Sequence, residues 1–193
     1  MSKISNIFFK YRSYTPIPFL ILMVAFAKPT VTSLAVGFAI ALSGELIRLW
    51  GVSWAGSETR TTGGVGGSFL IVSGPFAYVR NPLYIGNMLL YLGIGIMSLA
   101  LFPYLQIAAV IFFAIQYYFI VIEEEKFLND KFGDAYDEYV KNVPRFFMRL
   151  IPYKPGNVEQ PDYEFKKGLR SEKRTLQAFS SVTIILIIIW AVK

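Results

Sequence analysis

Apolar residues are gathered into long blocks, and this distribution limits the possible folds more than any other feature of the sequence. Five blocks are candidate membrane spans, at residues 16–27, 31–50, 83–102, 104–122 and 175–192. A transmembrane helix needs about 20 mostly apolar residues, and only the first block is clearly short of this. Of all residues, 17% are charged, whereas a soluble domain carries about 25%. The sequence therefore predicts an all-α integral membrane protein with about five transmembrane helices in a single domain, residues 1–193.

The composition also limits the chemistry. The chain contains no cysteine and no histidine. This excludes disulfides, thiol nucleophiles and thiolate metal sites, and it removes the commonest general base and metal ligand. We therefore expect no metal site. The net charge of +6 is typical of loops that border an anionic membrane leaflet, and we expect no nucleic-acid partner.

The distribution of Lys and Arg predicts how the chain is oriented. Basic residues favour the cytoplasmic loops of membrane proteins. With five spans and a cytoplasmic N-terminus, all of the 19 Lys and Arg residues except Lys28 and Lys193 lie on the cytoplasmic side. We therefore expect the N-terminus and the polar segments, which would carry the active site, in the cytoplasm. The C-terminus is expected on the opposite side.

Two charges fall inside the second apolar block. Glu45 and Arg48 are three residues apart, so they share one face of a helix. A charge near the centre of a membrane helix costs about 2.5–3.5 kcal/mol on insertion scales. We expect both residues near the cytoplasmic end, facing protein, either as a structural ion pair or as part of the wall of a site.

Two polar segments flank the hairpin formed by the third and fourth blocks. The first, Ser73–Gly86, places Tyr78, Arg80, Asn81 and Tyr84 around Pro82, which suits the first turn of a helix. The second, Glu123–Glu125, follows the fourth block. Its glutamates are either a solvated helix end or part of a site. Negative charge at a helix C-terminus is unfavourable, which favours a compensating partner. A hairpin would bring both segments to one membrane face.

The segment after the fourth block predicts an amphipathic helix on the membrane interface. Its apolar residues recur every three or four positions, at Phe127, Phe132, Tyr136, Tyr139 and Val140. Glu138 and Arg145 follow at a spacing of two helical turns and begin on one face. Pro144 bends the chain and could turn Arg145 back towards the site; the alternative is an ordinary interfacial arginine.

Two further features have mainly structural interpretations. Gly63–Gly67 matches neither of the glycine-rich nucleotide-binding patterns, so we interpret it as a flexible connector. Aromatic residues crowd the fourth block. They are typical of lipid contact and helix packing, with an aromatic wall for a cationic or prenyl-like group as the alternative. These residues are Phe112, Phe113, Tyr117, Tyr118 and Phe119.

The order of these segments resembles a known family of membrane enzymes. The matching blocks are Gly74–Tyr84, Glu124-Glu125, Phe132–Tyr136, Glu138-Tyr139 and Val143–Phe146. Across a helical hairpin, in this order, they resemble the isoprenylcysteine carboxyl methyltransferase and phospholipid methyltransferase family. The resemblance covers about residues 44–150. It implies a membrane methyltransferase with S-adenosylmethionine as methyl donor and S-adenosylhomocysteine as product.

The resemblance also implies roles for individual residues. The cofactor motif of the family is Arg-His-Pro-x-Tyr followed by a Glu-Glu pair. The residues implied to bind the cofactor are Tyr78, Arg80, Asn81, Pro82, Tyr84, Glu124 and Glu125. Glu138 and Arg145 fall where the family has catalytic or substrate-orienting groups. This chain departs from the motif at Asn81, which replaces histidine and can still accept and donate a hydrogen bond. It cannot provide imidazole acid–base chemistry.

Methyl transfer from a sulfonium is compatible with a chain that has no histidine. A carboxylate acceptor has no proton to lose, and positioning would supply most of the acceleration. An amine acceptor would need Glu138 or water to take a proton. We expect a lipophilic acceptor that enters from the membrane: a prenylcysteine-type carboxylate or thiol, a phospholipid amine or a similar small apolar molecule. The alternatives are a sterol-reductase-like NADPH oxidoreductase and a non-catalytic scaffold of the same fold. The oligomeric state stays open.

Overall fold

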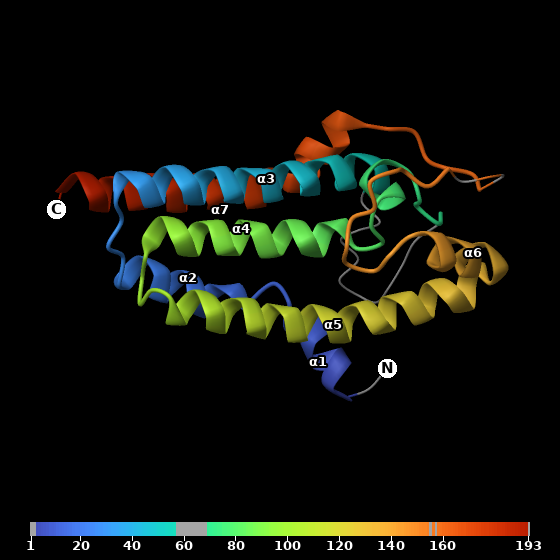
Figure 1. Cartoon of the computed structure of the whole chain (residues 1–193), viewed down its shortest axis with the longest axis horizontal. Coiled ribbons are helices and arrows are strands. Elements are labelled where there is room, and N and C mark those ends of the chain that lie inside the picture. The colour runs from blue at the N-terminus through green and yellow to red at the C-terminus, as the bar shows by residue number, and fades with distance from the viewer. Residues whose placement is uncertain (1–2, 57–68, 155, 157, 193) are drawn as a thin grey trace.

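Figure 1 presents a computed structural model that describes residues 3–56, 69–154, 156 and 158–192. Within these residues the secondary structure is helical and contains no strand. The predicted connector at Gly63–Gly67 lies outside the described residues. The elements are α1 (Lys3–Tyr11), α2 (Pro16–Ala25), α3 (Val31–Ala55), the 3₁₀ helix η2 (Gly74–Ala77), α4 (Pro82–Ser98), α5 (Tyr104–Phe132), α6 (Asp134–Asn142) and α7 (Phe165–Val192).

Three of the described helices are long and apolar enough to cross a membrane: α3, α5 and α7. The apolar helices α2 and α4 are shorter. Helices suit this role because every backbone polar group inside a bilayer needs a hydrogen-bond partner within the protein. The predicted all-α membrane fold is confirmed. The number of five crossings stays a prediction.

Several boundaries differ from the predicted blocks. α4 ends at Ser98 rather than at residue 102, because Leu99 and Leu101 adopt left-handed backbone conformations (φ 48°) that terminate a helix. α3 and α5 continue beyond their apolar blocks, and α7 begins at Phe165, well before the block at 175–192. Apolar content marks the part of a helix that suits lipid, whereas Lys, Arg and Glu are also good helix formers and extend it.

Glycines bring the backbones of α3 and α4 into direct contact. A Cβ atom added at Gly37 would lie 2.5 Å from the carbonyl oxygen of Gly93, and one at Gly44 would lie 2.5 Å from that of Gly86. Small residues allow this approach between membrane helices. The close contact fixes α4, which carries the first polar segment at its N-terminus, against α3.

The connections divide the bundle into two ends (Figure 1). The α2–α3 and α4–α5 turns lie at one end, where the Lys28 N–H donates to the Ser98 carbonyl at 2.8 Å. At the other end, called the polar end here, lie η2, α6, the segments 143–154 and 158–164, and the start of α7. Antiparallel α4 and α5 therefore bring both polar segments of the sequence to the polar end.

The predicted interfacial helix differs from the observed structure. Gly133, with φ 50°, separates the end of α5 from α6. α6 is short, and its apolar side packs against protein: Tyr136 and Tyr139 are buried in a small cluster with Leu70 and Val72. These tyrosines therefore face protein, and the location of the helix at the membrane interface stays a prediction. The helical spacing was correct, but residues far along the chain cover that face.

Candidate functional site

Glu125 lies at the centre of a charged cluster at the polar end. Arg145 contacts its carboxylate through two nitrogens, Nε to Oε1 at 3.0 Å and Nη2 to Oε2 at 2.6 Å. Arg80 adds a third contact, Nη2 to Oε1 at 3.2 Å. Paired contacts of this kind are the strong form of an arginine–carboxylate interaction. Two guanidinium groups thus converge on one carboxylate, and the Arg145 side chain keeps 36% of its surface exposed.

Asn81 occupies the position where the family motif has histidine. Its Nδ2 donates to the Arg145 carbonyl at 3.2 Å and to Glu125 Oε1 at 3.5 Å. The Arg80 backbone N–H donates to the Pro144 carbonyl at 2.9 Å. The segment around Pro144 is therefore held against the start of α4. This turn places Arg145 in the cluster, as the bend at Pro144 suggested.

Glu124 faces a different set of neighbours from Glu125. Consecutive helical residues point about 100° apart, and Glu124 Oε1 accepts a hydrogen bond from the Tyr84 hydroxyl at 2.7 Å. The Tyr84 ring lies against the Tyr117 ring, with centroids 4.7 Å apart. The positive charge of Arg12 also acts on Glu124. The two adjacent carboxylates therefore serve two separate parts of the site.

The surroundings of Glu123–Glu125 correct one premise of the sequence analysis. α5 continues to Phe132, so these glutamates lie inside the helix rather than at its C-terminus. Unfavourable interaction with the helix dipole, which falls off within the last turn, is therefore not the reason that they need partners. Arg80 and Arg145 supply the compensating charge for Glu125 instead.

Tyr78 and Pro82 take part neither in the charged cluster nor in the contacts of Glu124. The Tyr78 ring lies beside the Trp50 ring of α3, with centroids 6.0 Å apart. Pro82 is buried as the first residue of α4, where its missing N–H costs nothing. Pro82 therefore positions its neighbours. A direct role of Tyr78 in binding stays a prediction.

Glu138 also lies outside the cluster. Its side chain is exposed on α6, where its carboxylate accepts a hydrogen bond from the Tyr153 hydroxyl. Burial and the nearby Glu138 charge raise the pKa of Tyr153. The structure does not bring Glu138 together with Arg145, although both were predicted to be catalytic.

Tyr136 contributes a feature that the sequence analysis did not assign to the site. Its side chain is buried, and its hydroxyl has no hydrogen-bond partner among the described residues. The charges of Glu125, Arg80 and Arg145 all act on it. Burial is the main reason why the pKa of Tyr136 is raised well above its ordinary value, so the hydroxyl keeps its proton. A neutral hydroxyl is therefore available to a ligand.

The comparisons with known proteins place this arrangement in a family. Residues 32–135 match the model of the phospholipid methyltransferase family. The chain belongs to that family. The matched region contains Arg80, Asn81, Tyr84 and the Glu124–Glu125 pair, and it begins and ends earlier than the expected range of 44–150. The predicted family resemblance is confirmed, and the protein is a member of a membrane methyltransferase family.

Two curated proteins are similar to part of this family member. It is 35% identical over 109 residues to the cobalt-zinc-cadmium resistance protein CzcN of Cupriavidus metallidurans, covering 55% of this chain and 45% of that protein. It is 34% identical over 83 residues to the nickel-cobalt-cadmium resistance protein NccN of Alcaligenes xylosoxydans xylosoxydans, covering 42% of this chain and 37% of that protein. The alignments thus span less than half of each relative. No solved structure gives a significant match.

A second polar network lies inside the bundle of this phospholipid methyltransferase family member. Arg48 Nη2 contacts both carboxylate oxygens of Glu172, at 2.8 and 2.7 Å, and its Nη1 donates to Asn87. The predicted pair with Glu45 is present at 3.6 Å. The shorter contact is with Glu172, whose side chain is completely buried. This partner was missed because it precedes the last apolar block.

Tyr117 connects the Arg48 network with Tyr84, the partner of Glu124. Asn87 donates a hydrogen bond to its hydroxyl, which in turn donates to Tyr91, and its ring lies against Tyr84. Tyr84, Asn87 and Tyr91 share one side of α4 because they are three and four residues apart. Polar residues inside an apolar span usually face protein, and this periodicity was the available signal in the sequence. Tyr117 is thus part of a polar wall, in addition to helix packing.

Proposed function

We propose that this protein transfers a methyl group from S-adenosylmethionine to a lipophilic acceptor at the polar end of the bundle. The main support is the meeting of Arg80, Asn81 and Tyr84 of α4 with Glu124 and Glu125 of α5. These two segments carry the cofactor motif implied by the family resemblance, and they make direct polar contacts.

The chemistry of the donor set fits this cofactor. The methionine part of S-adenosylmethionine carries a carboxylate, which suits the guanidinium groups of Arg80 and Arg145. Its cationic groups suit Glu124 and the aromatic face of Tyr84. In addition, Arg80 Nε and the Tyr136 hydroxyl are buried and have no hydrogen-bond partner among the described residues. A ligand would satisfy such donors, since an unpaired buried donor is costly.

When bound, S-adenosylmethionine supplies an electrophilic methyl group on a sulfonium. The residues of the chain would bind and orient the reactants: Arg80 and Arg145 by charge, and Tyr84 and Tyr117 by shape and exclusion of water. A carboxylate acceptor needs no base, which suits a chain without histidine. For an amine acceptor, Glu138 is poorly placed to take the proton, because it is exposed and bonded to Tyr153.

The acceptor class is proposed from the membrane fold and the position of the site. The cluster lies at the end of helices that are apolar enough to span a bilayer, so an acceptor dissolved in the membrane can approach it laterally. A prenylcysteine-type carboxylate, a phospholipid amine and a similar small apolar nucleophile all meet this condition. The names of the two relatives describe metal resistance and specify no acceptor.

The positions of the basic residues support a cytoplasmic site. Lys28 lies in the α2–α3 turn, at the end of the bundle opposite the polar end. By contrast, Arg80, Arg145, Arg149 and the basic start of α7 lie at the polar end. Since Lys and Arg favour cytoplasmic loops, we propose that the polar end faces the cytoplasm.

Calorimetric titration of the detergent-solubilised protein with S-adenosylhomocysteine, and then with NADPH, tests the proposal. We expect saturable binding of S-adenosylhomocysteine that is lost in Arg80→Ala and Glu124→Gln. Arg174→Ala removes an exposed arginine of α7 and is the matched control, which should bind normally. Binding of NADPH alone would favour the reductase alternative. A folded protein that binds neither ligand would favour the non-catalytic scaffold.

A further inference from the structure

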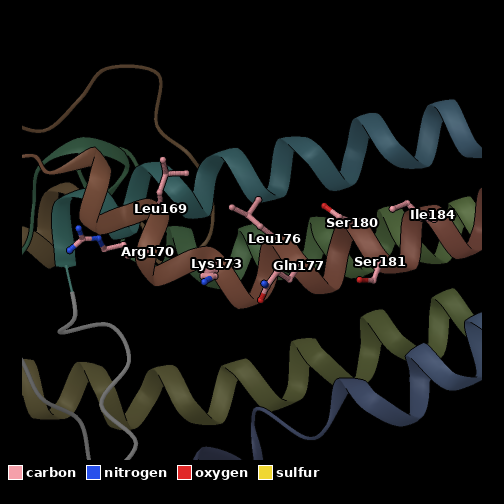
Figure 2. Close-up of a pocket in the computed structure, with 8 residues that line it drawn as sticks. All are labelled: Leu169, Arg170, Lys173, Leu176, Gln177, Ser180, Ser181 and Ile184. Carbon is pink, nitrogen blue, oxygen red and sulfur yellow. The ribbon is translucent and has the colours of Figure 1, made fainter.

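A shallow groove of about 760 Å³ runs along one face of α7 (Figure 2). None of its lining residues belongs to the charged cluster. The helix is the least covered of the three long apolar helices: 11% of its most apolar stretch is buried, against 33% for α3 and 44% for α5. The groove is lined by two cationic side chains, three polar ones and three aliphatic ones. They are Arg170, Lys173, Gln177, Ser180, Ser181, Leu169, Leu176 and Ile184.

The groove begins at cationic residues near the start of α7 and continues into the apolar block. Arg170 and Lys173 precede the apolar block at 175–192, whereas Ile184 lies within it. With a rise of 1.5 Å per residue, about 21 Å separates Arg170 from Ile184. Half of a bilayer's hydrocarbon core is about 15 Å thick. The groove is therefore about as long as a phospholipid that has its phosphate at the cationic end and one acyl chain along the helix.

The cationic end has charge to offer to a ligand. Within the described part of the chain, neither Arg170 nor Lys173 forms a salt bridge. The nearby acids are already engaged: Glu172 points inward to Arg48, and Glu164 pairs with Lys167. Long basic side chains at a membrane interface extend their charge towards the headgroups. Arg170 and Lys173 thus present two positive charges at the level of lipid phosphates.

Polar side chains continue the groove below this cationic end. Gln177 follows Lys173 by one turn, and Ser180 and Ser181 follow one turn later (Figure 2). All three are exposed, although uncompensated polar groups are costly in hydrocarbon. The ester carbonyls of a phospholipid lie just below its phosphate and accept hydrogen bonds. The serines, being small, leave room for the acyl chain.

We propose that this groove binds one acidic phospholipid. Its phosphate lies between Arg170 and Lys173, its ester region lies at Gln177, and one acyl chain follows Leu176 and Ile184. The anionic charge of the lipid complements a groove whose lining contains two cations and no carboxylate. This site is separate from the methyl-transfer cluster and does not depend on the proposed function.

Lipid binding by the full chain in detergent micelles tests the site. Native mass spectrometry compares added dioleoyl phosphatidylglycerol with dioleoyl phosphatidylcholine. We expect the wild type to prefer the acidic lipid, and the double variant Arg170→Gln/Lys173→Gln to lose this preference by about tenfold, since each basic residue near anionic lipid contributes measurably. The control Lys166→Gln/Arg174→Gln removes the same charge from exposed positions outside the groove and should retain the preference.

Three results would overturn the site: no preference for the acidic lipid in the wild type, an unchanged preference in the groove variant, or an equal loss in both double variants. The last would indicate diffuse attraction to the whole basic segment. If the groove variant fails to fold, Ser181→Trp replaces it, because the indole fills the groove without changing charge. We expect this variant to bind phosphatidylglycerol weakly.

Cysteine substitution tests whether the groove is occupied by a lipid or by a second copy of the chain. Because the sequence has no cysteine, Ser180→Cys and Ser181→Cys each introduce one thiol into the groove. We expect phosphatidylglycerol, but not phosphatidylcholine, to slow labelling of these thiols by a maleimide. Efficient disulfide cross-linking between copies in native membranes would instead assign this face to a subunit interface and would contradict the proposal.

Discussion

Two arginine–glutamate pairs in this protein have similar contacts but different surroundings. The Arg48–Glu172 pair joins α3 to α7 inside the bundle, and its side chains are 12% and 0% exposed. The Arg145–Glu125 pair joins the segment after α6 to α5, and its side chains are 36% and 13% exposed. A buried ion that loses its partner is strongly destabilising, whereas an ion pair contributes less to stability as its side chains become more exposed to solvent. The first pair therefore suits a structural role, and the second suits exchange with a ligand.

The largest loss of stability is expected when the carboxylate of the buried pair is removed. Glu172→Ala leaves the Arg48 guanidinium without its two contacts to this carboxylate, and we expect a loss of about 3–5 kcal/mol in the free energy of unfolding. Reversible unfolding in mixed micelles, followed by circular dichroism, measures it. Glu164→Ala, at an exposed residue near the start of α7, is the control. Equal stability of the two variants would refute a structural role for the buried pair.

The next largest loss of stability is expected at Gly86, whose backbone lies beside Arg48. A Cβ atom at Gly86 would lie 2.5 Å from Arg48 Cγ and 2.7 Å from the Gly44 carbonyl oxygen. We expect Gly86→Ala to cost about 1–3 kcal/mol of unfolding free energy, as overpacking generally does. Thermal unfolding in detergent measures it. Gly156→Ala meets nothing within 4 Å and should unfold like the wild type; a matching loss there would show that the effect is not one of packing.

Substitution in the more exposed Arg145–Glu125 pair should change ligand affinity more than stability. Arg145→Ala removes a guanidinium that could bind a ligand, and a hydrogen bond to a charged group contributes about 1.5–3 kcal/mol. If a ligand uses this group, its affinity falls by about tenfold or more, while the unfolding free energy changes by less than about 1 kcal/mol. Calorimetry with S-adenosylhomocysteine and an unfolding curve on the same sample separate the two effects. A large loss of stability with unchanged affinity would reverse the assigned roles.

The position of Glu125 was easier to predict from the sequence than that of Glu172. Arg80 and Glu125 fall in motifs at the ends of two neighbouring apolar blocks, so a hairpin alone brings them together. Glu172 lies 124 residues after Arg48 and precedes the last apolar block. Hydropathy gives it no reason to be buried. Its burial depends on α7 beginning at Phe165 and packing against α3, and neither fact follows from local composition.

A similar limit applies to α6. The spacing of Tyr136 and Tyr139 indicated a helix with one apolar side, which the structure confirms. It did not indicate what covers that side, because Leu70 and Val72 come from a distant segment. Nor did it reveal the break at Gly133, where a left-handed backbone conformation ends α5. Periodicity determines which residues share a face, whereas tertiary contacts determine whether that face meets lipid or protein.

The smallest effects are expected at the two buried tyrosines of α6. Tyr136 and Tyr139 are both buried, but among the described residues only the hydroxyl of Tyr139 has a partner, the Phe76 carbonyl at 2.8 Å. Tyr139→Phe leaves that carbonyl unpaired and should cost about 1 kcal/mol of unfolding free energy, with unchanged affinity for S-adenosylhomocysteine. Tyr136→Phe removes a hydroxyl that has no partner among the described residues, so stability should be unchanged or slightly higher.

If Tyr136 donates to a ligand, its substitution should lower the affinity for S-adenosylhomocysteine by about three- to tenfold, the range of one hydrogen bond. Paired calorimetry and unfolding curves on the two variants then give opposite patterns: stability lost at Tyr139, affinity lost at Tyr136. Because burial raises the pKa of Tyr136 well above its ordinary value, the difference should persist across neutral pH. Unchanged affinity in Tyr136→Phe would remove this residue from the site while leaving the pairing of Arg80 and Arg145 with Glu125 intact.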